Sequence, residues 1–260
     1  MTMFSPQLWH APEVSEAVFE HLPKLQEDLE QNLRYISEKH QDVRFASSLA
    51  VEDMVITEVI ARLNLPIKVF TLNTGKLHKE TLELLEATRQ RFPDLHIEEL
   101  HPLEEAVQDF DTNHGISSIY ESLEQRELCC GIRKIEPLNR ALEDADAWLT
   151  GQRRSQSTTR TELSFEEKDE QRGIAKFNPI FAWEEEDVWA YMKVHDLPFN
   201  KLYEKGYPSI GCEPCTRPIK IEEDIRAGRW WWENKDSKEC GLHQQTATSN
   251  THNEEESVGS

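Results

Sequence analysis

The stretch VRFASSLAVEDMVITEVIARLNLPIKVFTLNTG, residues 43–75, decides the fold. It contains a short strand candidate at 43–46, a turn of small residues at 47–50, an apolar helix pattern at 54–63 and a compact apolar run of strand length at 67–72. Two strands joined through a helix lie parallel, because the helix carries the chain back to the end of the sheet where the first strand began. The stretch therefore predicts an α/β fold built on a parallel sheet.

The same alternation continues on both sides of this stretch. The sequence predicts helices at 13–40, 77–91, 136–144 and 184–194, and strands at 96–100, 147–150 and 177–181. Such alternation is typical of a doubly wound, mostly parallel sheet, in which ligands bind beyond the carboxyl ends of the strands. Three of these strand ends carry small or polar turns, at 47–50, 73–75 and 151–154, and we expect the ligand site there.

The length of 260 residues suits one core. We expect a single α/β domain at 1–235, in which 1–40 forms a helical lead-in. A mobile segment at 236–243 and a tail at 244–260 follow. The tail is rich in Gln, Thr, Ser, Asn and Glu, a composition that predicts disorder.

The charge balance limits the partners. Forty-nine acidic and 29 basic residues give a net charge of −20, which disfavours nucleic acid and anionic membranes. The chain shows neither a secretory signal nor an apolar stretch of about 20 residues, so we expect a cytoplasmic protein without a membrane partner.

Basic residues nevertheless gather in the segments that flank the cysteines. They are Arg133, Lys134, Arg153, Arg154, Arg160, Arg217, Arg226 and Arg229. Any one of them is more simply interpreted as surface charge. Together they predict an anion site, since Arg guanidinium groups match the oxygens of phosphate and sulfate.

Five cysteines, an odd number, argue against a disulfide framework. Cys129 and Cys130 are adjacent, Cys212 and Cys215 form C-x-x-C, and Cys240 stands alone. Four thiolates bind either zinc or an iron–sulfur cluster. Adjacent side chains on a helix point about 100° apart, which favours a bulky cluster over one tetrahedral ion. Zinc and buried or redox-active thiols remain alternatives.

The lone cysteine is a candidate nucleophile. Cys240 lies near Lys238 and His243, and positive charge there favours the thiolate. An incidental thiol near a chain end is the alternative. The three tryptophans at 230–232, beside Arg229, are interpreted equally well as core packing.

Seven segments, taken in order, resemble the assimilatory sulfonucleotide reductases, in particular the branch that acts on adenylyl sulfate. They lie at 48–53, 72–75, 129–138, 151–157, 211–218, 228–231 and 239–243. The resemblance implies an adenine nucleotide α-hydrolase-like fold, related to the PP-loop ATP pyrophosphatases. Those enzymes carry an S-G-G-x-D-S loop. This chain has the bulkier SSLAVED at 47–53, which disfavours a triphosphate and fits one phosphate. Asn73 stands where the family often has Asp.

The resemblance also implies a reaction, a step of sulfate assimilation. Cys240 attacks the sulfur of adenylyl sulfate, AMP leaves, and a thioredoxin or glutaredoxin-like protein releases sulfite from the thiosulfonate. One [4Fe–4S] cluster would be held by Cys129, Cys130, Cys212 and Cys215. The substrate-binding residues that the resemblance implies are Lys134, Arg160, Arg226, Arg229, His243, Ser48, Leu49, Ala50, Glu52, Asp53, Thr74 and Gly75. A homo-oligomer is compatible with this assignment.

Three alternatives stay open. The first is reduction of the 3′-phosphorylated nucleotide, alone or with dual specificity; enzymes confined to that substrate generally lack the two cysteine pairs. The second is an ATP-using PP-loop enzyme with a structural zinc. The third is a non-catalytic electron carrier.

Overall fold

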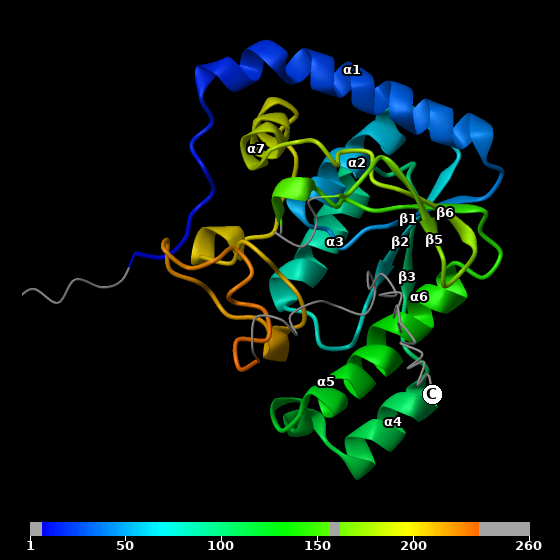
Figure 1. The fold of residues 1–260 in the computed structure, drawn as a ribbon, viewed down its shortest axis with the longest axis vertical. Helices are drawn as coiled ribbons and strands as arrows, with labels where there is room; N and C mark the ends of the chain where they lie inside the picture. Colours follow the sequence, from blue (N-terminus) through cyan, green and yellow to red (C-terminus); the bar gives the residue numbers. More distant parts are fainter. Residues whose placement is uncertain (1–6, 157–161, 234–260) are drawn as a thin grey trace, which may run out of the picture.

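The centre of the computed structural model, which describes residues 7–156 and 162–233, is a six-stranded sheet (Figure 1). Its spatial order is β3-β2-β1-β4-β6-β5. The strands are β1 (Val43–Ala46), β2 (Ile67–Leu72), β3 (Ile97–Leu100), β4 (Ala147–Leu149), β5 (Glu166–Asp169) and β6 (Ile174–Phe177). Every neighbouring pair is parallel except β5 with β6, so the prediction of a mostly parallel sheet is confirmed.

The strand order creates a switch point at the middle of the sheet. From β1 the chain adds β2 and β3 on one side, and then returns to pair β4 with the other side of β1. The connections that leave β1 and β4 therefore diverge at the carboxyl ends of these two strands. Open α/β sheets bind ligands in the crevice that such a divergence leaves.

Helices cover both faces of the sheet. They are α1 (Glu16–Lys39), α2 (Val51–Arg62), α3 (Lys79–Arg91), α4 (Glu104–Asn113), α5 (Leu123–Cys130), α6 (Glu136–Ala141) and α7 (Glu185–Val194). On one face, Phe45, Val69 and Leu149 pack in the core that contains α1, α2, α3 and α7. On the other face, Phe70 and Trp148 pack against α6. Side chains alternate between the two faces along each strand, which makes the fold doubly wound.

The predicted strand at 177–181 is wrong in its position. Strand β6 ends at Phe177, and the chain then turns, with the Phe181 N–H donating to the carbonyl of Asn178 at 3.0 Å. Pro179 has no N–H to donate to a sheet ladder, which accounts for the turn. The sequence patterns also did not predict the edge strand β5, whose four residues are all charged, or the helices α4 and α5.

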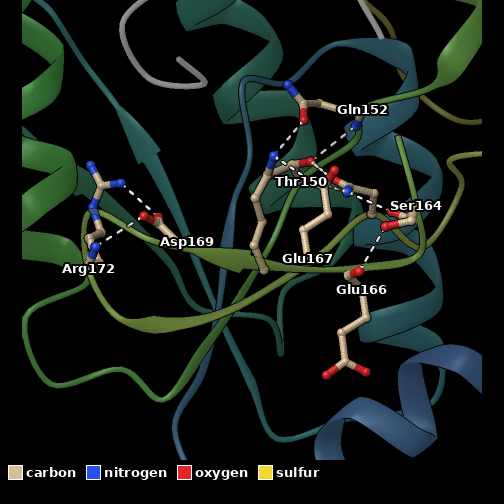
Figure 2. Close-up of polar contacts among 9 residues, drawn as sticks. Thr150, Gln152, Ser164, Glu166, Glu167, Asp169 and Arg172 are labelled. Carbon is tan, nitrogen blue, oxygen red and sulfur yellow. Dashed lines mark hydrogen bonds and ion pairs between the residues drawn. The ribbon is translucent and has the colours of Figure 1, made fainter. Parts of the chain in front are cut away.

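A polar network at the sheet edge holds the segment that leaves β4 (Figure 2). Thr150 donates to the Asn178 side-chain oxygen at 2.6 Å, and the Asn178 amide donates to Glu167 at 3.0 Å. The Lys176 ammonium donates to Gln152 at 2.9 Å and to Glu167 at 3.0 Å. The edge strands β5 and β6 thus fix residues 150–152, which lie at the switch point.

Within the described ranges, the structure contains no helix that combines the length and the apolar character of a membrane span.

Candidate active site

A cavity of about 280 Å³ opens at the carboxyl ends of β1, β2 and β4. Its wall includes residues from all three predicted turns, which confirms that the turns meet at one place. Of the predicted substrate-binding residues, Ser48, Ala50, Glu52, Asp53, Thr74, Lys134, Arg226 and Arg229 line it. Leu49 and Gly75 do not line it; they shape the turns after β1 and β2, both with positive φ (63° and 69°).

The turn after β1 is held by its own side chains. The Asp53 carboxylate accepts hydrogen bonds from the Ser48 N–H at 2.6 Å and the Ser48 hydroxyl at 2.7 Å. The Leu49 N–H donates to the Ser47 hydroxyl at 3.2 Å. These bonds keep Leu49 in the left-handed region, which side-chain-bearing residues rarely adopt. Helix α2 begins directly after the turn, so its N-terminal end lies at the cavity, where an anion is favoured.

The Asp53 carboxyl is buried, and it lies beside the turn that follows β4. Burial raises the pKa of its carboxyl to about 7, although the hydrogen bonds from Ser48 lower it. The backbone of Gly151 passes directly beside this carboxyl: a β-carbon on Gly151 would lie 2.1 Å from Asp53 Oδ1. A glycine after β4 is therefore required for the approach of the two turns.

A buried ion pair occupies the next part of the wall. Arg153 Nη2 lies 2.6 Å from Glu52 Oε1, and Arg153 Nε lies 3.2 Å from the same oxygen. Arg153 Nη1 donates to the Ser155 hydroxyl at 2.7 Å. The Arg153 guanidinium is thus engaged by the protein itself, although the sequence placed it in the predicted anion site.

Two further arginines that the sequence placed in the predicted anion site also contact other groups of the protein. Arg154 donates to the Leu163 carbonyl at 2.7 Å and lies over the Phe181 ring. Arg217 forms an ion pair with Glu223. Neither lines the cavity.

Arg229 presents a guanidinium at the opposite part of the wall. Its Nη1 donates to the Ile210 carbonyl at 3.2 Å, while its buried Nε has no hydrogen-bond partner among the described residues. Gly211 makes room for it, since a β-carbon there would lie 2.6 Å from Nη2. A buried N–H donor without a partner is costly, so this position suits an anionic ligand.

The four predicted metal-binding cysteines meet at a second, smaller hollow. Cys129, Cys130, Cys212 and Cys215 all line it, and none of the four forms a disulfide. The adjacent pair ends helix α5, where a π-helical turn (Gly131–Ile135) follows. The C-x-x-C pair flanks a short 3₁₀ turn (Glu213–Cys215). Segments more than 80 residues apart are thereby brought to one place.

Cations and hydrogen-bond donors surround these sulfurs. Arg126, Arg133 and Lys134 line the hollow with the cysteines. The Thr74 hydroxyl lies 3.2 Å from Cys212 Sγ, within hydrogen-bond distance for sulfur. An iron–sulfur cluster ligated by four thiolates is anionic, and its potential depends on such charges and hydrogen bonds. The residues present therefore fit a cluster.

Lys134 is shared by the two hollows: it lines both the large cavity and the cysteine hollow. It lies in the π-helical turn four residues after Cys130.

Trp230 packs where the large cavity and the cysteine hollow approach each other. It is 1% exposed and contacts the buried cysteines, so the core-packing interpretation applies to it. The guanidinium carbons of Arg126 and Arg229 each lie 4.8 Å from its ring centroid. Trp231, in contrast, is 40% exposed.

Some predicted residues lie outside the described ranges. They are Arg160, Cys240 and His243, together with the predicted mobile segment and tail.

Other cavity residues were not predicted. Thr150, Gln152, Glu185 and Trp189 line the cavity as well. Glu185 belongs to an acidic run at the start of α7, which the sequence explains by the helix dipole alone. Its neighbours in space could be recognised only after the fold was known.

The fold defines the class of protein first. A phosphoadenylyl-sulfate reductase from Candida auris superposes with a TM-score of 0.64 at 25% identity, covering 80% of this chain and 100% of that chain. A Candida glabrata FMN adenylyltransferase shares the fold alone, with a TM-score of 0.55 at 13% identity, covering 88% of this chain and 80% of that chain. The adenine nucleotide α-hydrolase-like class predicted from the sequence is confirmed.

The sequence comparisons then define the family. The model described as the phosphoadenosine phosphosulfate reductase domain matches residues 42–218, and the chain belongs to this family. A protein of Neisseria meningitidis serogroup B named adenosine 5′-phosphosulfate reductase is 55% identical over 242 residues, which is 93% of this chain and 98% of that protein.

Proposed function

We propose that this protein reduces adenylyl sulfate to sulfite and AMP, a step of sulfate assimilation. The observation that carries the proposal is the position of Lys134 in the wall of both the cavity and the four-cysteine hollow. A nucleotide in the cavity would point its anionic end towards the cysteines, and Lys134 would lie between this end and the cysteine hollow. The Neisseria relative, named for the same reaction, supports the substrate assignment.

The cavity suits an adenine nucleotide with one phosphate and one sulfate. The N-terminal end of α2 lies at the cavity, and the partial positive charge of a helix N-terminus favours a phosphate there. Lys134, Arg226 and Arg229 supply positive charge in the cavity wall, and Lys134 also lines the cysteine hollow. Attack of one anion on another requires such charge around the transferring group.

The four cysteines would hold one [4Fe–4S] cluster. When bound, the cluster supplies fixed charge beside the sulfate and leaves the electrons of the reduction to thiols. The two cysteine pairs line one hollow together with Arg126, Arg133 and Lys134, and these cations suit the negative charge of such a cluster.

The chemistry is assigned to Cys240. Its thiolate attacks the sulfur of adenylyl sulfate, an S–S bond forms, the S–O bond breaks, and AMP leaves with the bonding pair. A thiolate of a thioredoxin or glutaredoxin-like protein then attacks Cys240 Sγ and expels sulfite. The second thiol of that protein resolves the mixed disulfide, so that its dithiol is oxidised by two electrons.

Cys240 and the rest of the segment 236–243 lie outside the described residues, so the assignment of the nucleophile is a proposal from the sequence. The proposal also places the protein in the cytoplasm, where reductants keep thiols reduced. Lys238 and His243 flank the nucleophile in sequence, and Arg160 and His243 are proposed to join the substrate site.

A second candidate substrate is the 3′-phosphorylated nucleotide, favoured by the likeness to the Candida auris enzyme. Steady-state rates of sulfite release with both nucleotides distinguish the two. The proposal expects a higher kcat/KM with adenylyl sulfate, and a preference for the phosphorylated form would overturn it.

Trapping tests the nucleophile directly. The anaerobic protein is mixed with adenylyl sulfate in the absence of any thiol, and its intact mass is measured. We expect one sulfonate per chain, located on Cys240 by peptide mapping, and none in Cys240→Ser. An unmodified wild-type chain, or a sulfonate on another residue, would refute the assignment. A colourless protein that turns over ATP would instead favour an ATP-using enzyme with zinc.

A further inference from the structure

The cavity wall carries both cations and carboxyl groups. Lys134 also lines the cysteine hollow, and the guanidinium carbon of Arg229 lies 4.8 Å from the ring centroid of Trp230, which lines that hollow too. Three carboxyl groups line the cavity as well: Glu52, Asp53 and Glu185. A ligand with an anionic end and a neutral end is oriented by these charges, because its anionic end is attracted to the cations.

Two of the three carboxyl groups are engaged by the protein. Glu52 forms the buried ion pair with Arg153 at 2.6 Å, and Asp53 accepts two hydrogen bonds from Ser48. Glu185 differs from both: within the described part of the chain it has neither a hydrogen bond nor an ion pair. Its carboxylate is therefore available to a ligand.

The helix that carries Glu185 presents a surface that suits the binding of a nucleoside. Glu185, Val188 and Trp189 stand at positions i, i+3 and i+4 of α7, so they share one helix face, and all three line the cavity. Apolar and aromatic side chains beside one carboxylate suit a base and a ribose, with hydroxyl groups that donate to the carboxylate.

Negative charge is disfavoured beside Glu185. Burial raises the pKa of the Glu185 carboxyl, and the nearby Glu52 adds to the effect, while Arg153 opposes it. The Arg153 cation is bound to Glu52 and to Ser155. A phosphate group placed here would therefore meet a carboxylate without a cation of its own.

We propose that Glu185 determines which sulfonucleotide the protein accepts. Its carboxylate receives a ribose hydroxyl of adenylyl sulfate and repels the 3′-phosphate of the phosphorylated nucleotide. Dinucleotide-binding enzymes discriminate in the same physical way, with an acidic residue for a ribose hydroxyl and an arginine for a ribose phosphate. The inference rests on the proposed function, since it assumes that the cavity binds an adenine nucleotide.

Binding of two product nucleotides tests the inference without turnover. The dissociation constants of AMP and of adenosine 3′,5′-bisphosphate are measured by calorimetry with the full-length protein and with Glu185→Gln. The wild type is expected to prefer AMP. Removal of one charge should reduce this preference about ten- to thirtyfold, the effect of a unit charge at several ångströms in a partly buried site.

Glu186→Gln is the matched control. Glu186 is the next residue of the same helix, but it accepts from the Ser15 hydroxyl at 3.1 Å and does not line the cavity. The Glu186→Gln variant should keep the wild-type preference for AMP over adenosine 3′,5′-bisphosphate. Glu185→Ala provides a second test, because it removes the charge without leaving an amide, and it should reduce the preference in the same direction.

The outcomes separate the inference from the proposed function. An unchanged preference in both Glu185 variants, an equal loss of affinity for both nucleotides, or a wild type that prefers the bisphosphate would overturn the role of Glu185. A wild type that binds neither nucleotide would overturn the proposed function as well. A reduced preference in both Glu185 variants, with the Glu186 control unchanged, supports the inference.

Discussion

Gly151 and Asp53 belong to segments almost 100 residues apart, yet a β-carbon on Gly151 would lie only 2.1 Å from Asp53 Oδ1. Gly151 follows β4 and Asp53 lies in the first turn of α2, so this contact joins the two strand ends at the switch point. The carboxyl of Asp53 in turn holds Ser48 through two hydrogen bonds. The close approach of one glycine therefore determines the shape of the turn where the proposed phosphate site lies.

Gly151→Ala should weaken nucleotide binding as well as the stability of the fold. The new methyl group must displace the Asp53 carboxyl, and with it the Ser48 turn. Overpacking of this kind costs about 1–3 kcal/mol of stability. We expect AMP affinity to fall at least about tenfold, a loss of about 1.4 kcal/mol, in calorimetric titration. Gly131→Ala is the control, because a β-carbon there has no neighbour within 4 Å. Wild-type affinity in Gly151→Ala would contradict the proposed phosphate site.

The buried carboxyl of Asp53 makes stability depend on pH. Its pKa rises from 3.8 to about 7 on folding, so the folded state binds this proton more tightly than the unfolded state. Stability is therefore lost as the pH rises from about 4 to 7 and stays lower above that. Asp53→Asn removes the effect. Between pH 5 and pH 8, urea unfolding should show the wild type losing about 2–3 kcal/mol relative to this variant.

The exposed Asp94 provides the comparison for that experiment. Asp94→Asn should follow the wild type at every pH. A constant difference between the wild type and Asp53→Asn across the range would mean that Asp53 is ionised in the folded protein throughout.

Lys134→Ala should separate catalysis from nucleotide binding. The residue lines both hollows, so its charge is proposed to act on the sulfate during transfer. Loss of a donor that acts on developing charge lowers kcat by about a hundredfold or more. We expect this loss in sulfite release, with AMP affinity changed much less and the iron retained. The exposed Lys193, on α7, is the control. Near-normal sulfite release in Lys134→Ala would remove the central support of the proposed function.

Cys215→Ser should release the metal. With all four thiolates present, anaerobically isolated protein is expected to contain about four irons per chain and to absorb broadly near 400 nm. Serine at position 215 replaces a soft ligand by a hard one, so iron and colour should be lost and the melting temperature lowered. Cys240→Ser should keep the iron and lose sulfite release. Iron loss in the Cys240 variant would show that the fifth cysteine is a ligand.

Some features were readable from local sequence because they depend on neighbours along the chain. The segments predicted as strands at 43–46 and 67–72 become β1 and β2 with the same bounds, since most of their side chains are apolar and buried on a parallel sheet. The turn at 47–50 was recognised by its small side chains. In contrast, the four charged residues of β5 form a strand only because β6 pairs with them and Lys39 and Lys176 neutralise two of its carboxylates.

The candidate site also combines features that the sequence predicts with features that depend on the tertiary structure. The spacing of Cys129, Cys130, Cys212 and Cys215 suggested one shared centre, and the structure brings all four to a single hollow. The spacing of the basic residues did not reveal which of them are available to bind an anion. Arg153 lines the cavity and resembled an anion ligand, but Glu52 neutralises it. Arg229 also lines the cavity, and its Nε–H has no hydrogen-bond partner within residues 7–156 and 162–233.

The sequence by itself determined the α/β class, the family and the division of the cysteines into four and one. These depend on residue types and their spacing, which the chain carries regardless of its fold. Only the tertiary structure decided which charges remain available to a ligand, because ion pairing is set by distances between distant segments. Glu52, paired with Arg153, and Glu185, without a partner in the part of the chain that the structure describes, became distinguishable only when β1, β4 and α7 met around one cavity.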